Sequence, residues 1–185
     1  GLGDVYKRQL TLFFTMIASM ILGMGLPSIP AYIITATMAA PALANFDIPT
    51  LVAHMFVFYF GLFANITPPV ALAAFAGAGI AGGDPMRTGF QALKLSLAGF
   101  IVPFLFVYNP AMLMIDTANV AVNAREFAFP AWTTIVSIVF TSVVGILALG
   151  AAVEGYFKVG LNWFWRIFLG AGALCMICLL YTSPS

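Results

Sequence analysis

Two long stretches of the chain carry no charged side chain, and each is interrupted by residues that break helices. The first stretch runs from residue 9 to 46 and the second from 48 to 83. At ~1.5 Å per residue, a straight helix over the first stretch would be about 57 Å long, whereas the hydrocarbon core of a bilayer is about 30 Å thick. Neither stretch therefore forms one straight membrane span.

The first interruption is the sequence GMGLPSIP, residues 23–30, with two glycines and two prolines. It divides its stretch into arms of about 14 to 17 residues, which is on the short side for a full crossing. Two geometries remain open. Either the arms are two tight spans, or they form a re-entrant hairpin whose tip stops inside the membrane.

The second interruption is NITPPV, residues 65–70. Pro68 and Pro69 lack an N–H and disfavour helical geometry in the residue before each, so we expect the preceding helix to stop near Asn65 or Ile66. Each break alone is consistent with a simple kink. A pair of such breaks is the best sequence indication of a binding site in a secondary transporter, because broken backbone at membrane depth needs protein or water around it.

The remainder of the chain continues as alternating apolar segments and short polar connections. We expect a span over 90–108, an extramembrane loop over 116–130 and two transmembrane helices within 131–181. Residues 1–9 and 182–185 resemble foreign or truncated ends rather than parts of the fold, so we interpret the chain as a fragment.

Composition supports an integral membrane protein. The chain is 63% hydrophobic and 7% charged, with a mean hydropathy of +1.07, whereas a soluble domain carries about 25% charged residues. Long uncharged stretches containing Gly and Pro indicate helices rather than the alternating strands of a membrane barrel. The net charge of +1 gives no reason to expect nucleic acid.

The basic residues suggest an orientation. Arg87 and Lys94 flank one connection, and Lys158 and Arg166 flank another. Both connections lie on the same side if the intervening segments cross twice, and positive charge favours the cytoplasm.

Few residues have the chemistry of a catalytic or metal site. The sequence contains no carboxylate pair, no serine-hydrolase order and no phosphate-binding loop, so we expect neither an enzyme nor an ATP site. Cys175 and Cys178 form a lone C-x-x-C without the further ligands that a metal site requires. His54 is ionisable within an apolar segment and is either a proton-coupling group or a structural residue near the interface.

The interrupted segments carry a family resemblance. The blocks GMGLPSIPAYIITATMAAPAL, AHMFVFYFGLFANITPPVALAAFAGAGIAGGDPMRTGFQALKL and FLFVYNPAML closely resemble the large membrane subunit of tripartite ATP-independent periplasmic (TRAP) transporters. More narrowly, they resemble the fused permease that works with TAXI-type binding proteins. The resemblance covers roughly residues 10–115.

This resemblance implies an all-α integral membrane fold of the ion-transporter superfamily. Residues 10–115 would be the second of two inverted repeats of the transport domain, followed by further transmembrane helices. Within it, a re-entrant helical hairpin would occupy 10–44, a discontinuous helix 50–82 and a span 90–108. The first repeat is absent from this chain.

The resemblance also implies a site at which the hairpin tip meets the unwound helix near the membrane midplane. A sodium ion would be bound there, largely by backbone carbonyls, with no other metal, no cofactor and no catalytic residue. The implied sodium-binding residues are Gly23, Met24, Gly25, Asn65, Ile66, Thr67 and Pro68, and the substrate-proximal residues are Pro27, Ser28 and Pro69.

The function implied is sodium-coupled import of a small organic acid by an elevator-type mechanism. Its partners would be a TAXI-type periplasmic substrate-binding protein, the missing N-terminal half, and a small membrane subunit or its fused equivalent. The location would be a bacterial or archaeal cytoplasmic membrane, crossed several times. One alternative is a carboxylate symporter of the same superfamily that needs no binding protein. The other is a non-transporting scaffold subunit, which predicts kinked but continuous helices at 23–30 and 65–70.

Overall fold

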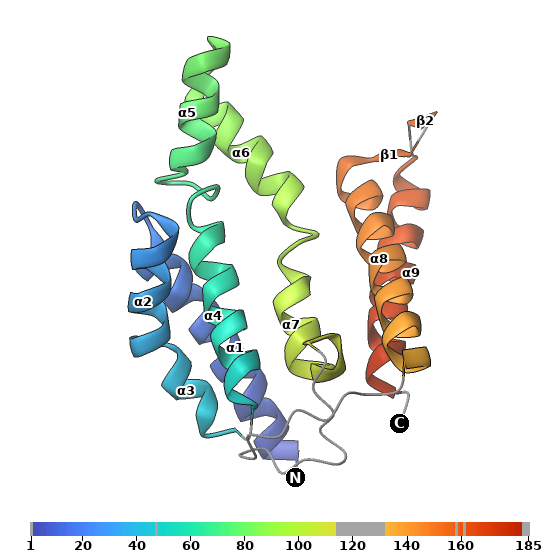
Figure 1. Ribbon diagram of the computed structural model, residues 1–185. Coiled ribbons are helices and arrows are strands. Elements are labelled where there is room, and N and C mark those ends of the chain that lie inside the picture. The colour runs from blue at the N-terminus through green and yellow to red at the C-terminus, as the bar shows by residue number, and fades with distance from the viewer. Residues whose placement is uncertain (1, 47, 114–131, 158, 161, 183–185) are drawn as a thin grey trace. The chain divides into compact units, whose positions relative to one another are not determined.

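The computed structural model describes the chain apart from residues 1, 47, 114–131, 158, 161 and 183–185, and it divides into two compact units, Gly1–Leu93 and Lys94–Ser185 (Figure 1). Regular structure in the described part is helical except for one pair of two-residue strands. This confirms the all-α class. The loop expected at 116–130 and the end at 183–185 lie outside the described residues.

The first unit contains a hairpin of helices followed by an interrupted helix. Its elements are α1 (Leu2–Gly23), α2 (Ser28–Met38), α3 (Ala40–Ala44), α4 (Thr50–Phe63), α5 (Leu72–Ala81) and the greater part of α6 (Pro85–Ser96). α1 begins at Leu2, so the residues that the sequence set apart at this end continue into the first helix without a break.

The chain reverses between α1 and α2. Gly25 has φ +73°, a left-handed conformation that glycine adopts without a steric penalty. Pro27 is the N-cap of α2, and Pro30 lies in the first turn, where a missing N–H leaves no helical bond unmade. α2 therefore runs back along α1, with which it is in contact (Figure 1).

The return arm is not one helix. α2 ends at Met38 and a short helix, α3, begins at Ala40 with a proline in its first turn. The physical reason is Pro41, which has no N–H to donate to the preceding turn and whose ring crowds the carbonyl there. The sequence predicted a single return arm without this division.

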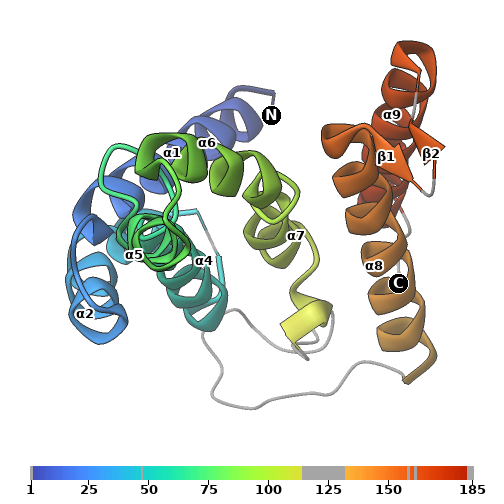
Figure 2. The ribbon, with the colours of Figure 1, turned by 90° about the horizontal axis from the view of Figure 1, so that it is seen from above.

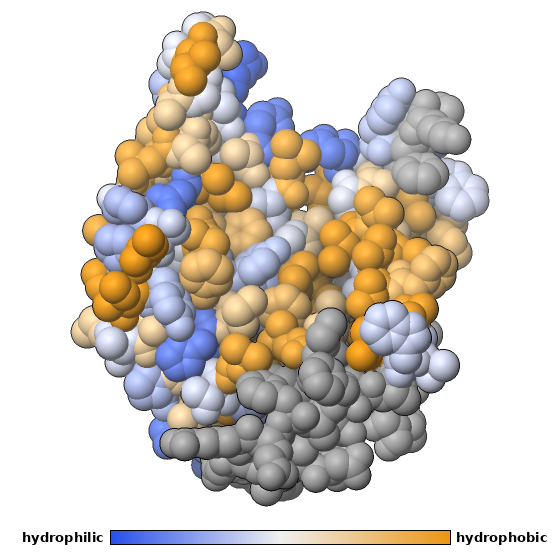
Figure 3. Space-filling view, viewed as in Figure 1, coloured by the Kyte–Doolittle hydropathy of each residue, from blue (hydrophilic) through white to orange (hydrophobic). Residues whose placement is uncertain are grey.

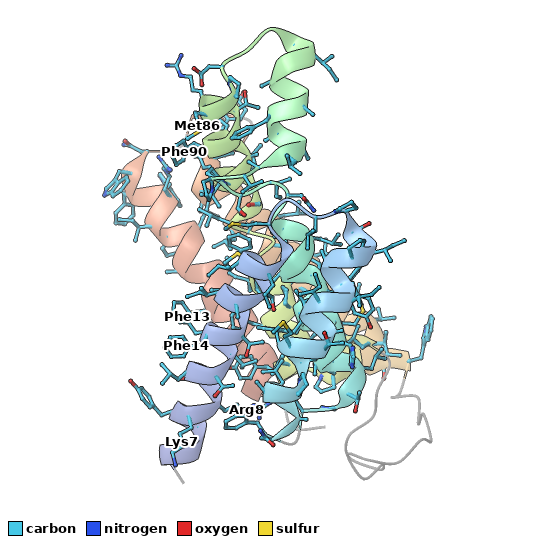
Figure 4. The ribbon with its side chains drawn as sticks, turned by 90° about the vertical axis from the view of Figure 1, so that its left-hand side faces the viewer. Lys7, Arg8, Phe13, Phe14, Met86 and Phe90 are labelled. Atoms are coloured by element: carbon cyan, nitrogen blue, oxygen red, sulfur yellow. The ribbon has the colours of Figure 1, made fainter. Side chains whose placement is uncertain are left out.

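α4 is the centre of the first unit. It contacts α1, α2 and α3, and Phe56 and Phe60 on its inner face are fully buried with ring centroids 4.9 Å apart. The outer face of α1 carries exposed aromatic side chains. Phe13 and Phe14 point outward from it (Figure 4), and apolar residues are exposed on the surface shown in Figure 3. An apolar exterior of this kind is expected of a protein that faces lipid.

The second unit is built on an antiparallel pair of long helices. Its elements, after the end of α6, are α7 (Ile101–Tyr108), the 3₁₀ turn η1 (Pro110–Leu113), α8 (Trp132–Glu154), β1 (Tyr156–Phe157), β2 (Val159–Gly160) and α9 (Trp163–Thr182). α8 packs along α9, and the two strands form the hairpin that joins them (Figure 2).

Arg166 closes the C-terminal end of α8. Its Nε donates to the carbonyl of Ala152 at 3.0 Å and its Nη2 to that of Val153 at 2.9 Å. The guanidinium carbon also lies 5.7 Å from the ring centroid of Trp163. The last carbonyls of a helix have no partner within the helix, so a cation at this end stabilises α8.

Two segments of the described chain are long and apolar enough to cross a membrane, Pro85–Tyr108 and Ile135–Glu154. The first comprises α6 and α7, which are separated by a turn at residues 97–100 that the sequence analysis did not expect. α2, α4 and α5 are apolar but contain only 11, 14 and 10 residues. At ~1.5 Å per residue, none of these three is long enough to span a core of about 30 Å.

Candidate functional site

The interruption between α4 and α5 is a defined non-helical segment. α4 ends at Phe63, slightly before the expected stop near Asn65 or Ile66, and α5 begins at Leu72. The N–H and hydroxyl of Thr67 both donate to the Phe63 carbonyl at 3.1 Å. The N–H of Ala73 donates to the Asn65 carbonyl at 3.0 Å, which bridges the break. The segment is therefore held in one conformation by its own hydrogen bonds.

The hairpin tip lies against this break. A Cβ placed on Gly25 would lie 3.7 Å from Cγ1 of Val70, the last residue of NITPPV. Two residues earlier in the chain, a Cβ on Gly23 would lie 2.5 Å from the carbonyl oxygen of Gly61 in α4. The two interruptions, separate in the sequence, are thus in contact. Figure 1 shows the α1–α2 turn at the level of the gap between α4 and α5.

Several carbonyls at this contact accept no hydrogen bond from any described residue. They belong to Met24 and Gly25 at the tip and to Ile66 and Pro68 in the break. The peptide between Pro68 and Pro69 is cis. Met24, Ile66 and Pro68 are half-buried and Gly25 is exposed, so these unpaired oxygens are accessible to a ligand that takes lone pairs.

Among the expected substrate-proximal residues, only Ser28 can donate a hydrogen bond, because Pro27 and Pro69 have no N–H. Ser28 is the first residue of α2, and its hydroxyl is exposed. N–H groups in the first turn of a helix have no partner inside the helix. Pro30 has no N–H, and that of Ala31 donates to the Pro27 carbonyl. The start of α2 therefore offers the N–H groups of Ser28 and Ile29 as donors of the kind that bind anions.

The sequence supplies no charged side chain in residues 9–46 or 48–83. A shallow, open apolar depression of about 210 Å³ lies beside the break, lined by Tyr59, Leu62, Phe63 and Ile66. These walls offer no countercharge. Any charged ligand of this site must be compensated by backbone dipoles, hydroxyls or a second ion.

Two residues that the sequence analysis did not select contribute to this contact. Gly61 allows the close approach of Gly23 and also faces Thr35, with 3.5 Å from its notional Cβ to Cγ2 of Thr35. Ser19, one turn below Gly23, is fully buried, and its hydroxyl has no hydrogen-bond partner among the described residues. The only feature of the sequence that could have pointed to Gly61 is its position within a helix rich in aromatic residues.

His54 has a partner that the sequence did not reveal. Its Nδ1 lies 3.1 Å from the Tyr32 hydroxyl, so it is half-buried between α2 and α4 rather than isolated. The described residues contain no group of three or more His, Cys, Asp or Glu side chains that could hold a metal ion. Cys175 is a free, exposed thiol, and the side chain of Cys178 lies outside the described residues.

Comparison with known proteins gives one family. Residues 3–120 match the family described as Tripartite ATP-independent periplasmic transporter, DctM component. The match covers the hairpin, the interrupted helix and the segment that follows them. No curated protein and no solved structure matches the chain.

Proposed function

The chain belongs to the DctM family, the large membrane component of TRAP transporters, and on this premise we propose that it forms part of a sodium-coupled permease for a small organic acid. Membership makes it a transporter component and a membrane protein, and the family is not an enzyme family. Beyond this membership, we propose which ion is coupled, which class of substrate is carried and by what mechanism.

The contact between the hairpin tip and the broken helix carries the proposal. Gly25 lies beside Val70, and the carbonyls of Met24, Gly25, Ile66 and Pro68 remain without partners there. Backbone carbonyls at a helix interruption are hard oxygen ligands of the kind that coordinate alkali cations in transporters. The proposed sodium-binding residues are Gly23, Met24, Gly25, Asn65, Ile66, Thr67 and Pro68.

An organic acid fits the same arrangement. The surrounding stretches contain no Lys or Arg, so a carboxylate bound here has no side-chain countercharge within them. A bound sodium ion supplies one positive charge in a low-dielectric site, where opposite charges attract strongly. The free N–H groups at the start of α2, next to Ser28, would receive the carboxylate. Binding of the ion and of the acid would then be coupled.

The remaining parts of the proposal concern assembly and movement. The substrate would be delivered by a periplasmic binding protein, of the TAXI type in the narrower form of the proposal, and the permease would include a small membrane subunit or its fused equivalent. The first inverted repeat would complete the substrate site. The transport domain would then move elevator-fashion across a bacterial or archaeal cytoplasmic membrane.

Two alternatives differ from this proposal in what they require. A scaffold subunit predicts kinked but continuous helices at both interruptions, whereas the chain reverses at residues 24–27 and is non-helical from Ala64 to Ala71. That difference favours transport. A carboxylate symporter without a binding protein would use the same ion site, and only its independence of a binding protein separates it.

The test is uptake by the complete transporter reconstituted in liposomes. The proposal expects accumulation of an organic acid that needs an inward sodium gradient and the periplasmic binding protein. Uptake that needs sodium but no binding protein would support the symporter. Uptake with potassium in place of sodium would contradict the coupling, and no uptake of any organic anion would support the scaffold.

A further inference from the structure

A hydrogen bond between the side chains of Tyr32 and His54 links the hairpin to the interrupted helix. Tyr32 of α2 and His54 of α4 are 3.1 Å apart between Oη and Nδ1. The Tyr32 ring also packs edge-on against Phe58, with centroids 5.4 Å apart at 88°. Tyr32 and His54 are both half-buried. The pair therefore lies in the interface between two helices of the first unit.

Two threonine hydroxyls of α2 form hydrogen bonds only within their own helix. Thr35 donates to the carbonyls of Ala31 and Tyr32, and Thr37 to those of Ile33 and Ile34. These bonds stay within α2 and do not join it to another helix.

Around Gly61, the contact between α2 and α4 consists of small groups. A Cβ on Gly61 would lie 3.5 Å from Cγ2 of Thr35 and 4.0 Å from the Ala31 carbonyl oxygen. Contacts of this kind attract without direction, so they permit α2 to slide or turn by a fraction of an ångström. A hydrogen bond has a preferred length and angle. The bond from Tyr32 to His54 therefore fixes the position of α2 along α4, which the small-residue contact alone does not fix.

We infer that Tyr32 and His54 are positioning residues for the ion and substrate site, because their bond holds α2 in register on α4. This inference rests on the proposed function. The turn that leads into α2 contains Gly25, which meets Val70, and a binding constellation has to be held to within about 0.5 Å to work. Neither Tyr32 nor His54 is among the proposed sodium-binding residues.

The hydrogen-bonding chemistry of the pair distinguishes a positioning role from a role in proton coupling. The Tyr32 hydroxyl can donate to Nδ1 when that nitrogen is unprotonated, and it can accept from Nδ1–H in the other tautomer or the imidazolium. The link is therefore retained in each protonation state of His54. An uncharged amide at the position of Nδ1 should replace it.

The experiment measures the sodium concentration for half-maximal uptake by the complete transporter. Tyr32→Phe and His54→Leu should each raise that concentration about threefold, and at most about twentyfold, which corresponds to the average and the strongest interhelical hydrogen bonds measured in a membrane. The double variant should match either single one, because the same bond is lost. His54→Asn should stay within about twofold of the wild type, since its amide restores the bond. Tyr156→Phe, at an exposed tyrosine of the second unit, is the matched control.

The outcomes are distinguishable. Unchanged half-saturation in Tyr32→Phe, or effects that multiply in the double variant, would overturn the inference. A loss in His54→Asn equal to that in His54→Leu would also overturn it and favour proton coupling. If His54→Leu fails to assemble, Tyr32→Phe and His54→Asn still decide, because both keep most of the side-chain volume. Sodium-independent uptake by the wild type would instead contradict the proposed function itself.

Discussion

Gly23 in α1 lies against the backbone of Gly61 in α4, so closely that a Cβ on Gly23 would be 2.5 Å from the Gly61 carbonyl oxygen and 2.9 Å from its Cα. The neighbouring atoms belong to backbone and cannot rotate away. Only a glycine at position 23 allows the hairpin to approach the interrupted helix at this distance.

Gly23→Ala should therefore separate α1 from α4. We expect a loss of about 1–3 kcal/mol in the free energy of unfolding, the usual cost of overpacking, together with loss of uptake. Gly77→Ala is the control, because a Cβ there meets nothing within 4 Å, and alanine should stabilise α5 by up to about 1 kcal/mol. Thermal unfolding of the purified variants measures both. Equal stability of the two variants would show that the close contact is absent.

The left-handed glycines offer a second comparison. Gly25→Ala and Gly82→Ala both place a side chain at positive φ, +73° and +68°, which should cost each variant about 1–2 kcal/mol of stability. Gly82 follows α5 in open space, whereas Gly25 is in the hairpin tip. The sodium concentration for half-maximal uptake should therefore rise in Gly25→Ala alone. A matching change in Gly82→Ala would mean that instability, not site geometry, is the cause.

Arg166 is expected to stabilise the second unit through α8. Arg166→Ala should lower the free energy of unfolding by about 1–3 kcal/mol, because two carbonyls at a helix end lose a charged donor. Arg166→Lys should recover only part of this, since a single ammonium cannot reproduce the two-donor fork. The check is thermal unfolding in detergent. Full recovery by lysine would indicate that charge alone, and not the bonds to Ala152 and Val153, is responsible.

The orientation of the chain can be tested by labelling. Lys94 at the end of α6 forms an ion pair of 3.0 Å with Glu154 at the end of α8, and the excess of positive charge predicts that both basic connections face the cytoplasm. After Cys175 and Cys178 are replaced by alanine, Met86→Cys and Tyr156→Cys should both react with an impermeant maleimide from the cytoplasmic face. Both positions are exposed. Reaction of the two from opposite faces would contradict this orientation.

The interruptions could be found from the sequence because the residues that cause them act locally. Glycine permits a left-handed turn at Gly25, and two consecutive prolines prevent any helix from continuing through residues 68 and 69, whatever surrounds them. The contact of Gly25 with Val70 was expected only from the family resemblance. The division of the return arm was overlooked, although Pro41 is visible in the sequence. The turn at residues 97–100 has no proline to mark it.

Partners across the first unit could not be predicted in the same way. Gly61, Ser19 and Tyr32 are unremarkable residues in apolar helices, and their roles depend on the register in which α1, α2 and α4 pack. His54 was recognised as unusual because it is ionisable. To predict its bond to Tyr32, one would have to know how α2 and α4 are rotated relative to each other, and no local sequence pattern determines that rotation.

The central claim, a sodium site where the hairpin tip meets the broken helix, is tested most directly by the sodium dependence of uptake in an Asn65→Ala/Thr67→Ala double variant. Thr37→Ala is the control, because the Thr37 hydroxyl is exposed and bonds to its own helix. The Thr67 hydroxyl donates to the Phe63 carbonyl and so helps to hold the segment that carries the proposed carbonyl ligands. Removing it together with the Asn65 amide should disorder that segment and raise the sodium concentration for half-maximal uptake about tenfold. The account predicts that rise in the double variant and wild-type behaviour in the control. Unchanged sodium dependence in the double variant would contradict it.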